Sequence, residues 1–282
     1  MNILKLRQLL QQFFIEDIGD GDISSTSIFP PSEKGQFSFY AKSDGLFCGA
    51  HIIQQAFHLL DPSIHVTLHV ADGDSITYNQ RLATIEGPIQ TLLSGERVVL
   101  NLVQRMSAIA TMTERAVAQT ANTNTRICDT RKTTPGLRML EKYAVRVGGG
   151  YNHRFGLYDC IMLKDNHIAF CGSITAAIER ARQTIGHTVN IEVEIESEAQ
   201  LHEAVEAGAD IIMFDNCTPQ QITAWRPYVP AHIVTEASGG ITLETIAAYA
   251  ASGVDYISLG FLTHSVQAFD MSARVTRKGA TI

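Results

Sequence analysis

Three short segments of the sequence place basic side chains where they could bind an anionic ligand. Arg131 and Lys132 are adjacent, His153 precedes Arg154, and Lys164 ends an apolar run. A guanidinium group binds carboxylates and phosphates through paired hydrogen bonds, whereas an ammonium group acts as a movable point charge. An isolated Arg-Lys pair is usually a solvated surface feature, but here the cations recur in a chain whose net charge is -7. The sequence therefore predicts a local cationic cavity for a strongly anionic ligand.

Acidic side chains occupy comparable positions in two later apolar segments. Glu194 lies in the segment VNIEVEIE, and Asp215 lies near the end of DIIMFDN. Carboxylates beside a polyphosphate hold magnesium or sugar hydroxyls, and magnesium often needs only one or two of them because it retains several waters. Glu192 lies on the same strand face as Glu194, since side chains on a strand repeat every second residue. For Glu192, a salt bridge inside the protein is an equally good interpretation.

Two adjacent glycines that follow a further apolar segment indicate a phosphate site. Gly239 and Gly240 come after IVTEAS, and a helix is expected to begin near Thr242. Glycine lets backbone amides approach a ligand closely, and the N-terminus of a helix attracts phosphate. We therefore expect a phosphate site at Gly239 and Gly240, although a Gly-Gly turn alone would be weak evidence.

All these residues follow short β-branched runs, each of which precedes a loop and a helical pattern. The candidate strands are residues 125–130, 161–165, 189–196, 210–216, 233–238 and 255–260. In parallel α/β folds the chemistry lies at the carboxyl ends of the strands, so we expect the polar residues to meet at one rim. Six strands fall short of the eight of a complete barrel. The sequence predicts an incomplete parallel α/β barrel, with a doubly wound sheet as the alternative.

The first third of the chain has a different pattern. Residues 1–14 suit an amphipathic first helix, and the sequence up to about Gly95 alternates short apolar runs with Gly and Asp turns, which is typical of antiparallel strands. A long helix is expected from Glu96 to about Ala121. We therefore divide the chain into an N-terminal domain, residues 1–110, and a catalytic domain, residues 111–267. The C-terminal tail, residues 268–282, is a candidate addition to the N-terminal domain.

Several classes of protein lack their usual sequence signals here. The five cysteines are scattered and form no CxxC pair, which fits reduced thiols in the cytoplasm. The ten histidines form no HExxH motif, and neither a P-loop nor a GxSxG elbow occurs. No apolar run approaches the roughly 20 residues that cross a bilayer. The acidic net charge argues against a nucleic-acid-binding surface.

The block DTRKTTPGLRMLEKYAVRVGGGYNHRFGLYDCIMLKDNHI closely resembles quinolinate phosphoribosyltransferases, also called nicotinate-nucleotide pyrophosphorylases (carboxylating). The similarity extends from EDIGDGDIS through GERVVLNLVQRMSAIAT to IEVEIES, MFDN, EASGGI and ISLGFLTHS, so it covers nearly the whole chain. The resemblance implies a partial (β/α) TIM-like barrel with an N-terminal open α/β sandwich domain. It also implies a homodimer in which each subunit helps complete its neighbour's active site; assembly into a hexamer is left open.

The resemblance assigns a role to each candidate site residue. Quinolinate carboxylates are expected to bind Arg131, His153, Arg154 and Lys164, with Arg97 reaching across from the other subunit. Lys132, Glu194 and Asp215 are expected around the ribose, pyrophosphate and magnesium of phosphoribosyl pyrophosphate, and the choice of Glu194 over Glu192 rests on motif register. The remaining substrate-binding residues are Thr130, Ser238, Gly239, Gly240, Gly260, Phe261 and His264, and the catalytic set is Lys132, Lys164, Glu194 and Asp215.

The implied reaction joins quinolinate to the phosphoribosyl group and releases pyrophosphate and carbon dioxide, giving nicotinate mononucleotide for NAD biosynthesis. Three alternatives compete with it. A homologue associated with molybdate transport departs from the DTRK and KDNH segments, which are intact here. Nicotinate phosphoribosyltransferase handles a monocarboxylate, for which the cations are excessive. A catalytically silent binding protein would not need the acidic and basic groups together.

Overall fold

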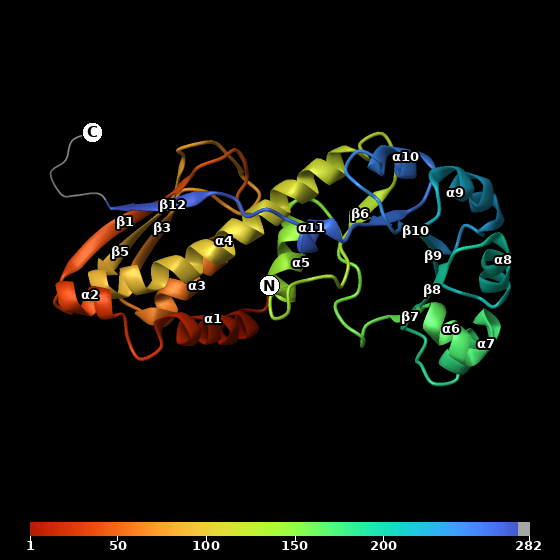
Figure 1. The fold of residues 1–282 in the computed structure, drawn as a ribbon, viewed down its shortest axis with the longest axis horizontal. Coiled ribbons are helices and arrows are strands. Elements are labelled where there is room, and N and C mark those ends of the chain that lie inside the picture. Colours follow the sequence, from red (N-terminus) through yellow and green to blue (C-terminus); the bar gives the residue numbers. More distant parts are fainter. Residues whose placement is uncertain (276–282) are drawn as a thin grey trace. The chain divides into compact units, whose positions relative to one another are not determined.

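The computed structural model describes residues 1–275 and divides the chain into two units. Unit 1 comprises Met1–Met112, Pro135–Gly148 and the described part of Val266–Ile282, and unit 2 comprises Thr113–Thr134 and Gly149–Ser265 (Figure 1). No helix in the described part of the chain is long and apolar enough to cross a membrane.

Unit 2 is built on a six-stranded parallel sheet with the strand order β6-β11-β10-β9-β8-β7. The strands are β6 (Arg126–Cys128), β7 (Ile161–Leu163), β8 (Ile191–Ile195), β9 (Ile211–Asp215), β10 (Val234–Ser238) and β11 (Tyr256–Ser258). Each expected strand segment contains one of them, so the expected mixed α/β fold with a parallel barrel-like sheet is confirmed. Within the described residues β6 and β7 are the two edges of the sheet, which does not close.

The helices that lie wholly in unit 2 are α6 (Asp165–Cys171), α7 (Ile174–Arg182), α8 (Glu198–Glu206), α9 (Pro219–Trp225), the short η1 (Arg226–Tyr228), α10 (Ile246–Ala251) and α11 (Phe261–His264). Helices α7 to α10 cover one face of this sheet (Figure 1). On β8, Ile191, Val193 and Ile195 are buried on one face. The strand period then places Glu192 and Glu194 together on the other face.

Unit 1 has an antiparallel sheet in the order β12-β1-β5-β3. Its strands are β1 (Lys34–Ala41), β3 (His65–Leu68), β5 (Arg81–Pro88) and β12 (Met271–Val275), and β2 (Gly45–Leu46) pairs separately with β4 (Ser75–Ile76). Helices α1 (Ile3–Ile18), α2 (Ile23–Ile28), α3 (Ala50–Leu60), α4 (Ile89–Ala118) and α5 (Arg138–Val147) complete the helical elements that belong wholly or partly to it. The expected antiparallel N-terminal sheet and first helix are therefore confirmed.

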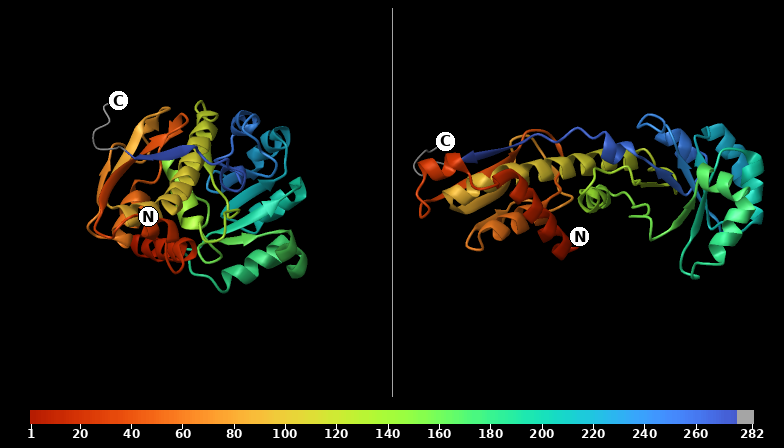
Figure 2. Two further views of the ribbon diagram at one scale, coloured as in Figure 1. Left: turned by 60° about the vertical axis from the view of Figure 1, so that its left-hand side comes forward. Right: turned by 60° about the horizontal axis from the view of Figure 1, so that its bottom comes forward.

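Helix α3 and the first part of α4 lie on one face of this sheet (Figure 2). The ring of Phe57 on α3 packs 5.9 Å from that of Phe37 and 6.4 Å from that of Phe39, both on β1. A Cβ added to Gly95 of α4 would lie 2.7 Å from Leu60 and 2.9 Å from Phe57. The glycine therefore lets α3 and α4 approach each other closely.

Two boundaries differ from those expected. Helix α4 begins at Ile89 rather than Glu96, so Gly95, which the sequence placed in the turn-rich N-terminal region, lies within the helix. Residues 135–148, expected in the catalytic domain, belong to unit 1. Helix α5 in this segment is held there by two contacts: Arg105 Nε donates to Glu141 (2.8 Å), and Tyr143 Oη donates to Asp72 (2.7 Å).

The C-terminal tail returns to unit 1, where β12 pairs with β1 from Met271↔Ala41 to Val275↔Phe37. This strand lies in the tail, residues 268–282, that the sequence made a candidate addition to the N-terminal domain. Residues 276–282 of that prediction lie outside the described residues.

Candidate active site

Polar residues and glycines lie at the carboxyl ends of the parallel strands of unit 2. Because the strands are parallel and hydrogen-bonded in one sheet, their carboxyl ends share one rim. The residues are Thr130, Arg131 and Lys132 after β6, Lys164 after β7, Glu194 on β8, Asp215 ending β9, Ser238, Gly239 and Gly240 at the end of β10, and Gly260 and Phe261 after β11. The rim expected from the sequence is present.

A short segment beside β6 carries two further candidates, His153 and Arg154. Tyr151 forms a parallel bridge with Cys128, so the segment runs alongside the strand. The buried carboxylate of Asp129 then accepts hydrogen bonds from the His153 backbone N–H (2.9 Å) and from Asn152 Nδ2 (2.6 Å). Asp129 therefore fixes the backbone from which both side chains project.

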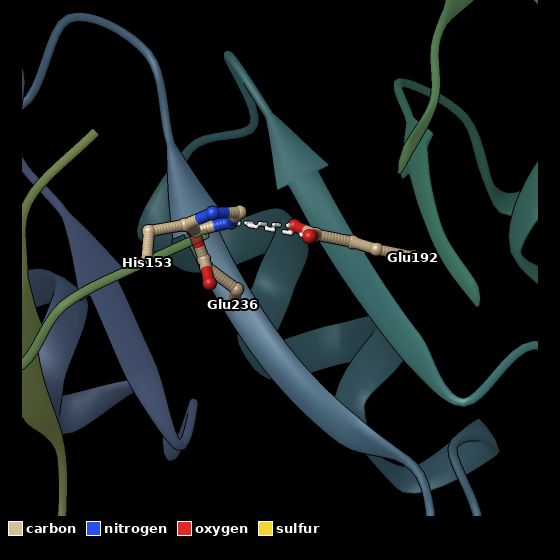
Figure 3. Close-up of side chains that lie close together, drawn as sticks. All are labelled: His153, Glu192 and Glu236. Atoms are coloured by element: carbon tan, nitrogen blue, oxygen red, sulfur yellow. Dashed lines mark hydrogen bonds and ion pairs between the residues drawn. The ribbon is translucent and has the colours of Figure 1, made fainter. Parts of the chain in front are cut away.

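The Nε2 atom of the His153 imidazole lies close to two buried carboxyl groups (Figure 3). Its Nε2 is 3.1 Å from each oxygen of Glu192 on β8 and 3.5 Å from Oε1 of Glu236 on β10. Its Nδ1 accepts a hydrogen bond from the Arg154 backbone N–H at 2.8 Å. Burial, and next the charge of Glu192, raise the pKa of Glu236 to about 7, against the opposing effect of His153.

The guanidinium of Arg154 has a donor that no described residue satisfies. Its Nη1 donates to the Cys160 carbonyl at 3.1 Å, but its Nε is buried without a hydrogen-bond acceptor. An unsatisfied buried donor on a cation is costly in free energy, and an anionic ligand would remove that cost. Burial also raises the pKa of the Cys160 thiol to about 11, so this cysteine is a poor nucleophile.

Lys164 and Glu194 form an ion pair at the ends of β7 and β8. Burial raises the pKa of Glu194, and Lys164 opposes the shift, while the charge of Asp215 raises the pKa further. The charge of Asp215 therefore disfavours the charged form of Glu194. A cation between them, or sugar hydroxyls that donate to them, would stabilise both in their charged form.

The glycine turn after β10 is tightly constrained by the loop after β9. Gly239 and Gly240 have φ angles of +92° and +63°, which favour glycine. Asn216 also has a positive φ, +54°, and its N–H donates to the Ser238 carbonyl at 2.9 Å. Asp215 accepts from Asn216 Nδ2 at 2.9 Å. The two loops therefore support each other and present a side-chain-free backbone at the rim.

Lys132 is brought to the loop after β11. Thr263 Oγ1 donates to the Lys132 carbonyl at 2.8 Å, and Lys132 N–H donates to Thr130 Oγ1 at 3.0 Å. A Cβ on Gly260 would lie 3.0 Å from the His264 ring and 3.1 Å from Lys132 Cδ. The absence of a side chain at Gly260 thus makes room for both neighbours.

Comparison with models of protein families identifies the family of this chain. The N-terminal and C-terminal domain models of quinolinate phosphoribosyl transferase match residues 22–107 and 109–274. The chain belongs to the quinolinate phosphoribosyltransferase family.

Members of this family match most of the chain. A probable nicotinate-nucleotide pyrophosphorylase [carboxylating] of Bacillus subtilis is 58% identical over 100% of this chain and 97% of its own. A protein of the same name from Synechocystis sp. is 43% identical over 95% of this chain and 92% of its own. The crystal structure of NadC from Streptococcus pyogenes matches with a TM-score of 0.93 at 40% identity, covering 97% of each chain. Human nicotinic acid phosphoribosyltransferase, with a TM-score of 0.59 and 12% identity over 98% of this chain and 74% of its own, shares the fold alone.

The structure distinguishes the two carboxylates of β8, which the sequence left open. Glu192 is 1% exposed and hydrogen-bonded to His153, whereas Glu194 is partly exposed and paired with Lys164. Sequence reasoning did not single out Glu236. A signal was present, because Glu236 lies two residues before Ser238 and therefore on the same face of its strand, as Glu192 does relative to Glu194. Arg97 is an exposed residue of α4 in unit 1, so unit 2 by itself does not contain it.

Proposed function

We propose that this member of the quinolinate phosphoribosyltransferase family transfers the phosphoribosyl group of phosphoribosyl pyrophosphate to quinolinate. Decarboxylation then gives nicotinate mononucleotide, pyrophosphate and carbon dioxide for NAD biosynthesis. The names of full-length relatives support the reaction. The structural observation that carries the proposal is the buried Nε of Arg154, which lacks an acceptor among the described residues and suits an anionic ligand.

The proposed quinolinate pocket consists of Arg131, His153, Arg154 and Lys164. Two adjacent carboxylates on a pyridine ring need more than one cation, and the arginines offer planar donor pairs. Arg154 is anchored through Cys160 and its own backbone, so its fork is preorganised. Both ring nitrogens of His153 contact protein groups: Nε2 faces Glu192 and Glu236, and Nδ1 accepts from the Arg154 backbone N–H. His153 would therefore contribute to the pocket by holding its neighbours in place. Arg97 of the partner subunit is proposed to complete the pocket in a homodimer.

The proposed site for phosphoribosyl pyrophosphate uses the ends of the four central strands, β8 to β11, with Thr130 and Lys132 after β6. Ser238, Gly239 and Gly240, with Gly260 and Phe261, would bind phosphate through backbone N–H groups, with Thr130 and His264 beside them. Lys132 would offset the pyrophosphate charge. Glu194 and Asp215 fit magnesium, because their mutual repulsion is relieved by a cation and magnesium needs few protein ligands. Bound magnesium would neutralise charge that develops on the pyrophosphate.

The proposed reaction begins with attack of the quinolinate ring nitrogen on the anomeric carbon of the ribose. Pyrophosphate departs with the bonding electron pair, and Glu194 or Asp215 stabilises the positive charge on the ribose ring. The new pyridinium nitrogen then accepts electron density as the carboxylate next to it leaves as carbon dioxide. A proton adds to the carbon that remains. Lys132 and Lys164 stabilise the anionic groups, and no covalent enzyme intermediate is needed.

The proposal includes a cytoplasmic location, supported by five cysteines that are all free thiols. It also includes a homodimer with shared sites, which Arg97 on unit 1 would serve. Further assembly of dimers into a hexamer is compatible with it.

The test incubates purified protein with phosphoribosyl pyrophosphate and magnesium, and adds quinolinate or nicotinate in parallel. We expect nicotinate mononucleotide from quinolinate and none from nicotinate. Product from nicotinate alone would assign the protein to the nicotinate enzyme class. Absence of product from both would favour a silent or molybdate-transport-associated homologue.

A further inference from the structure

Two buried carboxyl groups, those of Glu192 and Glu236, lie beside the His153 imidazole and take no direct part in the proposed reaction. His153 Nε2 lies 3.1 Å from both oxygens of Glu192 and 3.5 Å from Glu236 Oε1, with the two carboxyl groups only 1% and 5% exposed (Figure 3). Such a group could bind a metal ion, or it could be a fixed hydrogen-bond network. The protonation of the imidazole decides between these possibilities.

The second ring nitrogen defines the protonation state of the neutral imidazole. The Arg154 backbone N–H can only donate, so His153 Nδ1 accepts its hydrogen bond at 2.8 Å and carries no proton. A neutral ring then carries its proton on Nε2, which faces Glu192. A metal ligand must be an unprotonated nitrogen with a free lone pair. The geometry is therefore that of a hydrogen-bond network.

We propose that Glu192, backed by Glu236, is a positioning residue for quinolinate binding that acts through His153 on Arg154. Glu192 accepts the Nε2 hydrogen and fixes the orientation of the ring. The ring in turn holds the Arg154 backbone through Nδ1, while Asp129 holds the His153 N–H at 2.9 Å. Arg154 is thereby presented with its Nε free for the ligand. This inference rests on the proposed function, because quinolinate is taken as the ligand.

Simple electrostatics predicts the opposite effect, which makes the proposal testable. Glu192 and Glu236 lie beside His153 of the pocket proposed for a dianion, so their negative charge alone would weaken binding. Removing a carboxylate would then strengthen quinolinate binding if charge were its only contribution. Burial raises the pKa of Glu236 to about 7, and Glu192, His153 and Asp129 are the titratable groups that face it. Protonation of Glu236 near neutral pH limits the charge penalty of keeping two carboxyl groups here.

The experiment compares Glu192→Leu, which removes the acceptor, with Glu192→Gln, which keeps an acceptor oxygen but no charge. We expect Glu192→Leu to raise the quinolinate Kd about tenfold or more, and Glu192→Gln to raise it less than about threefold. The Kd for phosphoribosyl pyrophosphate should stay within about twofold in both variants. Val193→Ala is the matched control, because Val193 is buried on the opposite face of the same strand. At a comparable loss of Tm it should leave the quinolinate Kd unchanged.

A double variant tests the role of Glu236. Since both carboxyl groups act through one ring, Glu236→Leu should add less than about twofold to the Kd of Glu192→Leu. If the effects of Glu192→Leu and Glu236→Leu on the binding free energy of quinolinate are fully additive, Glu236 has no part in the proposal.

Two measurements keep this inference separate from the proposed function. The 15N spectrum of the imidazoles, with His153 assigned from a His153→Gln sample, should show the Nε2–H tautomer in the wild type and a changed signal in Glu192→Leu. A Nδ1–H tautomer, tighter quinolinate binding by Glu192→Leu, or a stoichiometric transition metal that is lost in Glu236→Gln would overturn the inference. Failure of the wild type to form product from quinolinate would instead overturn the proposed function and leave the tautomer result standing.

Discussion

A Cβ atom on Gly239 would lie 2.2 Å from Oδ1 of Asn216 and 2.8 Å from its backbone nitrogen. The loop after β9 and the turn after β10 are thus packed so closely that only glycine fits, and the φ of +92° at Gly239 also favours glycine. The proposed phosphate site depends on this close approach, because the bare backbone is what a phosphate would meet.

Gly239→Ala is therefore expected to displace the Asn216 loop and weaken phosphoribosyl pyrophosphate binding by about tenfold or more, with a loss of about 1–3 kcal/mol in the free energy of unfolding. Titration calorimetry and denaturant unfolding measure the two effects. Gly253→Ala is the matched control, since Gly253 has a φ of +84° but open space around a Cβ. It should lower stability by about 1 kcal/mol without changing the affinity. Equal affinities for all three proteins would contradict the proposed phosphate turn.

Arg154→Lys keeps the positive charge but removes the planar donor pair and the buried Nε. We expect the KM for quinolinate to rise about tenfold or more, while the KM for phosphoribosyl pyrophosphate changes by less than about twofold. Steady-state kinetics with each substrate varied in turn separates these values. Arg126→Lys is the control, because Arg126 is exposed at the opposite end of β6, where it stacks on Tyr151. Equal changes in both KM values would remove Arg154 from the quinolinate pocket.

Glu236 should make the protein less stable as the pH rises. Its folded pKa of about 7 is higher than the ordinary value of 4.5, so the folded state binds the proton more tightly than the unfolded chain. The contribution of Glu236 to the free energy of unfolding is then fully present below about pH 4.5. It is lost as the pH rises to about 7, by roughly 1–3 kcal/mol. Glu236→Gln should flatten this part of the curve of unfolding free energy against pH. The unfolding free energies are measured in urea. If the curve against pH has the same slope for Glu236→Gln as for the wild type between these pH values, Glu236 is ionised throughout this range.

The strands of unit 2 could be predicted because each apolar run is short, β-branched and followed by a helical pattern. The rim followed from the same pattern, since Lys164, Asp215 and Gly239 come directly after or at the end of strands. The partnership of His153 with Glu236 could not be predicted: the two residues are far apart in the sequence, and an acidic residue within a buried strand has no local signal for its partner. The position of α5 in unit 1 likewise depends on contacts with distant residues, such as that of Tyr143 with Asp72.

The proposed sharing of sites between subunits predicts complementation. Arg97→Ala and Arg131→Ala homodimers should each lose most activity, because each lacks one guanidinium in every site. When the two variants are coexpressed with different affinity tags and exchange freely, about half of the dimers are mixed, and one of two sites in each is intact. About a quarter of wild-type activity should therefore return. Activity that stays at the level of the separate variants would show that Arg97 serves the site of its own chain or none.

The most direct measurement follows the fate of each quinolinate carboxyl group. Quinolinate labelled with 13C in the carboxyl group next to the ring nitrogen should release the label as carbon dioxide, in a one-to-one ratio with pyrophosphate and nicotinate mononucleotide. Label in the other carboxyl group should remain in the nucleotide. Pyrophosphate release without carbon dioxide, or retention of the first label in the product, would contradict the proposed carboxylate recognition and decarboxylating transfer.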